Sequence, residues 1–147
     1  MEFLYYQEIP EPDVLAGVME LHKHVFEGAE LGLEKLVEKK NLITLVAREN
    51  GQVVGFKIGY EFKDHTFYSW LGGVHSDYRG KGIASELMRR QHELVKTLGY
   101  KKVRTISRNI RREMLLLNIK VGFDVIETFT SEKGKHKIIL EKTIRKD

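Results

Sequence analysis

The chain has 147 residues, close to the usual size of one domain, and we expect a single domain over residues 1–147. Its 25 Lys and Arg against 21 Asp and Glu give a net charge of +4, and a composition of 41% apolar and 31% charged residues is typical of soluble globular proteins rather than disordered tails. The absence of cysteine excludes disulfides, thiolate metal sites and a cysteine nucleophile. The chain opens without a basic-then-apolar leader, and no apolar run approaches the roughly 18 residues of a membrane span, so we expect a cytoplasmic protein with no membrane partner.

The N-terminal part is predicted to hold one strand and two helices. The strand covers Phe3–Ile9, and the two prolines that follow should end it. Asp13 fits the N-cap position of a helix over Val14–Phe26, where apolar residues recur at helical spacing. A second helical stretch is predicted from about Ala29 to Lys40.

Three strands in succession are predicted next. Leu42–Arg48 and Val53–Phe62 flank the segment Glu49–Gln52, whose Asn-Gly pair is a good hairpin signal. Phe67–Val74 is the third strand, and it carries two glycines near its end. Glycine inside a strand marks a bulge or a close approach by another backbone.

The last third of the chain alternates between helix and strand and ends in a hairpin. The predicted elements are a helix over Gly82–Leu98 capped by Gly99, a strand over Lys102–Ser107, a helix over Arg111–Val121 stopped by Gly122, and strands over Phe123–Thr130 and His136–Ile144. The strand–helix–strand unit in the middle of the chain is a crossover. Its two strands should therefore be parallel in an otherwise mainly antiparallel sheet.

The segment between the third strand of this run and the next helix has the features of a phosphate-binding turn. Gly80 and Gly82 allow the backbone to come close to a ligand without a Cβ in the way. The first turn of the following helix offers unpaired N–H groups and the positive end of its dipole. Arg79 and Lys81 add two positive charges. The segment therefore predicts a cradle for a diphosphate.

The turn differs from two common phosphate loops and resembles a third. The P-loop needs Ser or Thr directly after its Lys, and the dinucleotide loop needs a third glycine where Ser85 stands. Arg79-x-x-Gly82-x-Ala84 instead resembles the Q/R-x-x-G-x-G/A motif of the GNAT superfamily of N-acetyltransferases. The run from Val74 to Arg79 and the Gly122-Phe123 pair also resemble that family, so the likeness covers nearly the whole chain.

The resemblance implies a fold and a ligand. The fold is α/β: a single GNAT-like domain with a mixed, mainly antiparallel sheet of about seven strands, splayed between two central parallel strands and flanked by about four helices. The ligand is an acyl-CoA, most often acetyl-CoA, with no metal. Its pyrophosphate should lie on the backbone amides of one turn: Arg79, Gly80, Lys81, Gly82, Ile83 and Ala84. Its pantetheine arm should add onto the strand end at Gly73 and Val74.

A basic cluster follows the second parallel strand. Asn109 lies among Arg108, Arg111 and Arg112, and these residues are candidates for binding CoA phosphates or an anionic substrate. The alternative is a solvated basic first turn, which the helix dipole mildly disfavours.

The catalytic groups are less clear than the CoA loop. Many GNAT enzymes carry a proton-donating tyrosine at the position of Asn118, and an amide cannot replace it as an acid near neutral pH. Asn118 could still donate a hydrogen bond to the thiolate or the pantetheine chain, or it could be a helix-surface or capping residue. Tyr78, Tyr60 and Ser107 are further candidate acids.

Two residues are candidates for the general base. Glu61 lies near the end of the strand before the phosphate-loop strand, and His75 directly follows Val74. An unperturbed histidine has a pKa of about 6.5 and suits a base, although a solvated loop histidine is the favoured interpretation of His75. The remaining histidines lack metal-ligand spacing.

The sequence therefore predicts an acyl-CoA-dependent N-acetyltransferase that moves an acetyl group from acetyl-CoA to a primary amine by direct attack on the thioester. The alternatives are a protein N-terminal or lysine acetyltransferase and a non-catalytic acyl-CoA-binding module, the latter suggested by Asn118 and the missing base. A sequence pI of about 9.2 is weak support for nucleic-acid binding, and we expect no nucleic-acid partner. The C-terminal hairpin offers an edge that could pair in a homodimer.

Overall fold

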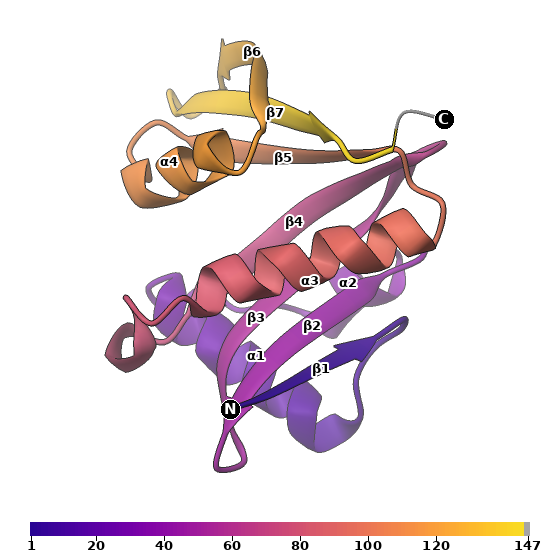
Figure 1. The fold of residues 1–147 in the computed structure, drawn as a ribbon. Coiled ribbons are helices and arrows are strands. Elements are labelled where there is room, and N and C mark those ends of the chain that lie inside the picture. The colour runs from indigo at the N-terminus through magenta and orange to yellow at the C-terminus, as the bar shows by residue number, and fades with distance from the viewer. Residues whose placement is uncertain (146–147) are drawn as a thin grey trace.

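The computed structural model describes residues 1–145, which form one seven-stranded sheet in the order β1-β2-β3-β4-β5-β7-β6, with helices on both faces (Figure 1). The strands are β1 (Glu2–Tyr6), β2 (Ile43–Glu49), β3 (Gln52–Lys63), β4 (Thr66–Val74), β5 (Lys102–Arg108), β6 (Asp124–Thr130) and β7 (His136–Thr143). The helices are α1 (Pro12–Val25), α2 (Leu33–Val37), α3 (Ile83–Thr97) and α4 (Arg112–Lys120), with a 3-10 turn, η1, at Ser76–Tyr78. Among the strands of residues 1–145, only β4 and β5 pair in parallel, which confirms the predicted crossover and fold class.

Two predictions for the N-terminal part were wrong in their bounds. The first helix begins at Pro12 with Glu11 as N-cap, not at Asp13, because proline suits the first helical position, where its missing N–H is not needed. The predicted second helix shrinks to α2, five residues long. Glycines account for its late start, since Gly28 takes a positive φ of 89° and Gly32 is the N-cap.

The two parallel strands separate after a short paired segment. Their pairing runs from Thr66 opposite Lys102 to Ser69 opposite Thr105. Beyond these residues β4 continues to Val74 and β5 to Arg108, but the two strands no longer pair with each other. Figure 1 shows them diverging. We call this opening between β4 and β5 the wedge.

A bulge in β4 lies at the start of the wedge. Ile58 pairs with Leu71, whereas the next residue, Gly59, pairs with Ser69, so Trp70 is the extra residue of β4. A bulge bends its strand and increases the local twist. It therefore helps β4 to turn away from β5 at this point.

The sheet separates two hydrophobic cores. The core on the α1 and α2 face contains Val14, Val18, Leu21, Leu31, Leu36, Leu42, Val46, Val53, Phe56 and Ile58. The core on the α3 and α4 face contains Ile43, Leu45, Ala47, Val54, Phe67, Ile83, Leu87, Met88, Val95, Tyr100, Val103, Phe123 and Leu140. Alternate residues of β2 therefore enter different cores, as the two-residue period of a strand requires.

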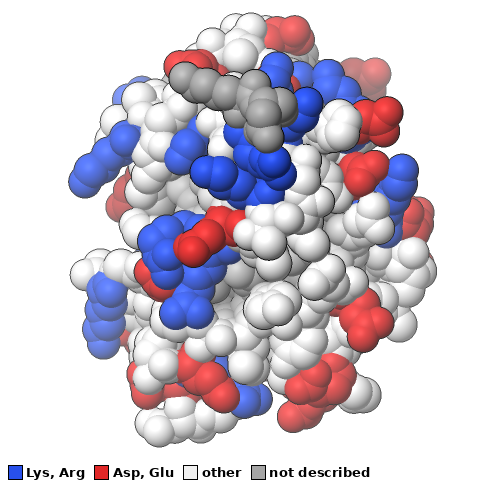
Figure 2. All heavy atoms as spheres, turned by 45° about the vertical axis from the view of Figure 1, so that its right-hand side comes forward, with Lys and Arg blue, Asp and Glu red and all other residues white. Residues whose placement is uncertain are grey.

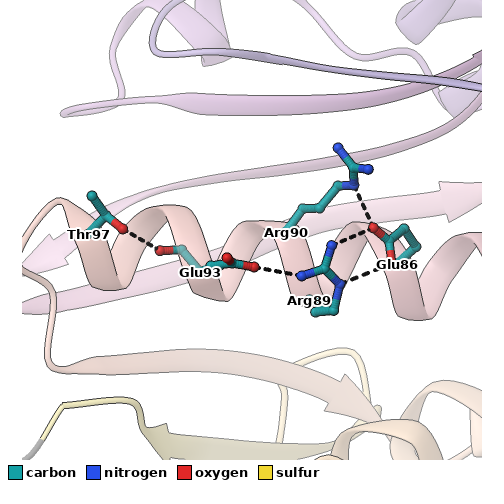
Figure 3. Close-up of polar contacts among 5 residues, drawn as sticks. All are labelled: Glu86, Arg89, Arg90, Glu93 and Thr97. Atoms are coloured by element: carbon teal, nitrogen blue, oxygen red, sulfur yellow. Dashed lines mark hydrogen bonds and ion pairs between the residues drawn. The ribbon is translucent and has the colours of Figure 1, made fainter.

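Ion pairs fix the outer face of α3 (Figure 3). Glu86 accepts hydrogen bonds from Arg89 Nη2 at 2.8 Å and from Arg90 Nε at 2.6 Å, and Arg89 Nη1 donates to Glu93 at 2.6 Å. These two arginines lower the pKa of the Glu86 carboxyl to about 2. The Arg90 guanidinium also lies 4.4 Å from the ring centre of Phe3, which links the outer face of α3 to β1.

The exterior carries charges of both signs. On the face shown in Figure 2, basic and acidic side chains are interspersed with uncharged surface. Within residues 1–145, no helix combines the length and apolar character needed to cross a membrane.

Candidate active site

The turn between β4 and α3 depends on two glycines for its shape. Gly80 has a φ of 76° and Gly82 a φ of 80°, both in the left-handed region that side chains rarely adopt. A Cβ added at either residue would meet no atom within 4 Å, so backbone conformation rather than crowding requires glycine here. Gly82 is also the N-cap residue of α3.

A run of backbone donors in this turn has no acceptor. From Arg79 to Ser85, no backbone N–H donates to another residue of the described chain, and the next one, of Glu86, donates to the Gly82 carbonyl at 3.0 Å. A helix normally leaves only its first four N–H groups unpaired. Here the unpaired run begins in the loop and continues into the helix, at the positive end of the helix dipole. The turn is therefore chemically suited to an anion.

The charged residues of the turn lie at its surface. Arg79 Nε donates to the Val74 carbonyl at 3.3 Å, so its guanidinium folds back against the end of β4. Lys81 Nζ lies 5.1 Å from the ring centre of Tyr78. The structure thus brings the predicted pyrophosphate residues, from Arg79 to Ala84, into one turn, of which residues 79–82 are exposed and Ile83 is buried in the core.

Gly72 and Gly73 of β4 leave room for different neighbours, one on each face of the strand. A Cβ on Gly73 would lie 2.9 Å from Val25 Cγ1, so α1 packs against the strand where a side chain would be. A Cβ on Gly72 would lie 3.7 Å from Lys57 Nζ on the other face. Of the two alternatives predicted for these glycines, the bulge was wrong, because the bulge residue is Trp70, and a close approach by another backbone stays a prediction.

Three polar side chains are buried where α3 covers the wedge, and we call Lys57, Gln91 and His92 the wedge cluster. Their exposed fractions are 9%, 0% and 9%. Neither amide atom of Gln91 nor Nε2 of His92 has a hydrogen-bond partner within residues 1–145. Buried polar groups are normally paired, and an unpaired one costs about 1–3 kcal/mol. The cluster therefore has unused donors and acceptors.

Burial shapes the charges of the wedge cluster. It lowers the pKa of Lys57 to about 8. It also lowers the pKa of His92 to about 3, with further contributions from the positive charges of Lys142 and Lys57. His92 is therefore neutral at physiological pH, and its ring packs 5.5 Å from that of Phe123.

Asn118 is buried in α4, with 4% of its surface exposed. Its backbone carbonyl accepts a hydrogen bond from Phe123 N–H at 3.0 Å, and Phe123 is the residue that contacts His92. Asn118 thus lies on the α3 and α4 face of the sheet rather than on the helix surface.

His75 follows β4 but is held in place by its neighbours. Its ring stacks on that of His24 with centres 4.3 Å apart and planes 8° apart. Its Nδ1 accepts a hydrogen bond from the Asp77 N–H at 3.1 Å. A neutral imidazole has one accepting nitrogen, so this bond uses the lone pair that a base would need. His75 also lines a cavity of about 470 Å³ beside α1, together with Asp13 and Glu20.

Glu61 lies at the end of β3 where β4 and β5 are still paired, which is the opposite end of the sheet from Gly73. Lys40 Nζ lies 3.0 Å from its carboxylate, and Asn41 and Tyr100 each donate to it at 3.1 Å. The hydrogen bonds from Lys40 and Asn41 keep the pKa of this carboxyl below its ordinary value. The structure therefore does not bring Glu61 to the phosphate-binding turn.

Asn109 lies in the exposed turn after β5, at the open end of the wedge. Its N–H donates to the His136 carbonyl at 3.3 Å, and its carbonyl accepts from Arg112 Nε at 3.0 Å. Nearby, the Arg111 guanidinium lies 5.2 Å from the ring centre of Phe26 at the end of α1. The basic cluster thus reaches from the wedge to the α1 face.

An aromatic pair lies on the α1 face where the wedge begins. The rings of Tyr60 and Trp70 meet edge to face with centres 5.6 Å apart. Lys39 Nζ lies 4.8 Å from both ring centres. The pair therefore already holds an ammonium group of the chain itself by cation–π attraction.

Sequence reasoning missed the wedge cluster, although signals for it are present. Lys57 interrupts an apolar strand. The residues two positions before and after it are glycines, so no neighbouring side chain stands beside Lys57 on that face of β3. Gln91 and His92 interrupt the apolar stripe of α3.

Comparisons with known proteins agree with this geometry. A family model described as an acetyltransferase (GNAT) domain matches residues 40–125, more than half of the chain. An acetyltransferase of Pectobacterium atrosepticum is 27% identical over 104 residues, which cover 71% of this chain and 73% of that protein. An acetyltransferase of Yersinia pseudotuberculosis is 27% identical over 99 residues, covering 67% and 70%.

Solved structures share the fold over nearly the full length. An aminoglycoside 6'-acetyltransferase of type Ii superposes with a TM-score of 0.85 at 17% identity and covers 100% of this chain and 99% of that one. An aminoglycoside 6'-N-acetyltransferase complexed with coenzyme A gives 0.81 at 15% identity, with 100% and 99% covered. The ribosomal-protein-S18-alanine N-acetyltransferase from Escherichia coli gives 0.79 at 14% identity, with 99% and 96% covered. The turn at Gly82, the splayed strands and the family match together show that the chain belongs to the GNAT superfamily of acyl-CoA-dependent N-acetyltransferases.

Proposed function

We propose that the protein transfers an acetyl group from acetyl-CoA to a primary amine by direct attack of the amine on the thioester. The observation that carries the proposal is the run of unpaired N–H groups from Arg79 to Ser85 around two left-handed glycines. These donors suit the two linked phosphates of CoA. A solved structure with the same fold contains coenzyme A, which adds support.

The wedge also suits the pantetheine arm, which carries two amide groups. Beyond Ser69 the edge of β4 that faces β5 is free of strand pairing, so an extended arm could pair with it at Gly73 and Val74 as an added strand does. The unused polar atoms of Gln91 and His92 lie beneath α3 on the same side as Asn118. In this arrangement Asn118 would donate a hydrogen bond to the arm or to the sulfur.

The acceptor would approach from the α1 face. Tyr60 and Trp70 hold the Lys39 ammonium there, which shows that these two rings can bind a cation. In our proposal Lys39 moves aside and the same rings bind the cationic form of an amine substrate, which an alcohol could not replace.

The acceptor must lose its proton before it attacks. A lysine-like amine with a pKa of about 10.4 is neutral only about once in 2,500 at pH 7, which adds about 4.6 kcal/mol to the barrier, whereas an α-amine with a pKa near 8 adds about 1 kcal/mol. His75 and Glu61 already use their basic atoms in contacts within the chain. We therefore expect faster transfer to weakly basic amines and a rate that rises with pH.

The test is a screen for CoA thiol release with acetyl-CoA and three acceptor classes: small amines, peptides with a free N-terminus, and N-blocked peptides with one lysine. Mass spectrometry of the product identifies the acetylated nitrogen. Amine-dependent thiol release supports the proposal, and the acceptor class that responds separates small-molecule from protein acetylation. If CoA binds but no acceptor class causes thiol release, the protein is a non-catalytic acyl-CoA-binding module and the proposal is wrong.

A matched pair of glycine variants tests the CoA turn. Gly82 and Gly51 both have a φ of 80° and open space where a Cβ would lie, but Gly51 belongs to the β2–β3 hairpin. Gly82→Val and Gly51→Val should therefore lose similar stability through backbone strain. Calorimetry should show at least tenfold weaker CoA binding in Gly82→Val alone. Equal CoA affinity in the two variants would contradict the assignment of the turn.

A further inference from the structure

The Lys57 side chain extends from β3 over Gly72 of β4. Lys57 pairs with Gly72, and a Cβ on Gly72 would lie 3.6 Å from Lys57 Cγ and 3.7 Å from its Nζ. Because Gly72 has no side chain, the Lys57 side chain can extend across β4 at this position. Gly72 lies three residues beyond Ser69, the last residue of β4 that pairs with β5. Because Trp70 is the extra residue of the bulge, this advance corresponds to two residues of β3, from Gly59 to Lys57, and places Gly72 about 7 Å into the wedge at roughly 3.3 Å per residue.

No group of the described chain neutralises this charge. Lys57 makes no hydrogen bond or ion pair within residues 1–145. The ionisable groups that act on the cluster from the packed elements are His92 of α3, which is neutral, and Lys142 of β7, which is positive. A buried cation without a counterion is costly to the fold, and the open atoms of Gln91 beside His92 add to that cost. The arrangement suits a negative charge that is present only during the reaction.

We propose that Lys57 donates the proton to the sulfur that leaves during acyl transfer. The inference rests on the proposed function. The acceptor nitrogen forms a bond to the acyl carbon, and the carbon–sulfur bond breaks with its electron pair on sulfur. Sulfur takes a proton from the Lys57 ammonium, and the acylated nitrogen gives its extra proton to water. Lys57 then regains a proton from solvent, so that one amine and one thioester become one amide and one thiol.

Two further facts favour Lys57 in this role. Asn118 is buried on the same face of the sheet, and its amide cannot give up a proton near neutral pH. The pKa of Lys57, about 8, is close to the value of about 8.5 for a free thiol, so the proton transfer is nearly balanced in free energy. At pH 7 most of the Lys57 side chain is still protonated and able to donate.

The first test measures the bound thiol rather than catalysis. The ultraviolet absorbance of the thiolate is followed against pH for CoA bound to the wild type, Lys57→Met and Lys142→Met. Lys142→Met is the matched control, because it also removes a lysine charge near His92 but from β7. We expect the thiol pKa in the wild type and in Lys142→Met to lie at least one unit below about 8.5, a tenfold increase in thiolate at a given pH. In Lys57→Met it should return to its ordinary value.

The second test separates the sulfur from the rest of the ligand. Calorimetry compares CoA with desulfo-CoA, which lacks the sulfur, and Lys57→Met should weaken the binding of CoA above pH 8 and leave that of desulfo-CoA nearly unchanged. With a weakly basic acceptor amine of pKa near 8, the rate of acetyl transfer in the wild type should rise with pH as the amine loses its proton and then fall above about pH 8 as Lys57 loses its own, whereas in Lys57→Met it should level off without a fall. Lys57→Gln, which is shorter, repeats each measurement if the Met variant fails to fold.

The outcomes are distinguishable. If CoA binds all three proteins with the same thiol pKa, Lys57 does not face the sulfur and the inference is overturned. If CoA binds none of them, including the wild type, the proposed function itself has failed.

Discussion

Lys57 carries its charge inside the protein, and its replacement by methionine should stabilise the ligand-free fold. Burial lowers its pKa from 10.5 to about 8, which corresponds to about 3 kcal/mol at about 1.36 kcal/mol per pKa unit. Methionine has a similar length and no charge to desolvate. We expect the free energy of unfolding at pH 7 to rise by up to about 3 kcal/mol, or by about 2–4 °C in Tm for each kcal/mol.

The sign of the pH dependence follows from the same values. The folded protein holds the Lys57 proton more weakly than the unfolded chain does, so the charge destabilises the fold fully below pH 8. This cost shrinks between pH 8 and 10.5 and is absent above 10.5. The advantage of Lys57→Met over the wild type should therefore decline across that interval.

Urea unfolding of both proteins from pH 7 to about 10.5 measures this difference. Lys63→Met, at the exposed end of the same strand, is the control and should give no pH-dependent difference from the wild type. A constant difference between Lys57→Met and the wild type over the whole range would refute the reasoning, because a buried titrating ammonium cannot produce it.

Two further predictions test packing and the carboxylate of Glu61. Gly73→Ala should destabilise the fold by about 1–3 kcal/mol in urea unfolding, because its Cβ would lie 2.9 Å from Val25 Cγ1, and Val25→Ala in the same protein should recover most of that loss. Additive losses in the double variant would contradict the contact. Glu61→Gln should leave calorimetric CoA affinity unchanged and cause a small loss of stability at pH 7, since the contact with Lys40 is largely exposed. Because hydrogen bonds lower the Glu61 pKa, this loss should disappear as pH falls through that lowered pKa, and an unchanged loss at acid pH would argue against it.

The turn between β4 and α3 could be predicted from sequence because its determinants are local, and its binding of phosphate stays a prediction. Gly80, Gly82 and Arg79 lie within four residues, and the start of a helix can be recognised from the residues around it. The parallel pairing of β4 and β5 was equally accessible, since a strand–helix–strand crossover leaves few other arrangements.

The wedge cluster could not be predicted because it is assembled by tertiary packing. β4 and η1 lie between the strand that carries Lys57 and the helix that carries His92, and the interrupted apolar pattern around either residue does not identify its partner. The position of Glu61 could not be predicted because it depends on the register of β3 against β4. The sequence does not show which end of β3 lies beside the turn between β4 and α3. The pairing of Glu61 with Phe67 places its carboxylate at the opposite end of the sheet.

The division of the hydrophobic interior into two cores has a consequence for engineering. The family match begins at residue 40, so it leaves out α1 and α2, the helices that build the core on the face from which we propose that the acceptor approaches. Residues 1–39 could therefore be exchanged for the corresponding segment of another family member to change acceptor preference while donor binding is retained. The contact of Val25 with Gly73 sets the condition for such a graft: the incoming helix must keep a side chain there that fits against a bare strand.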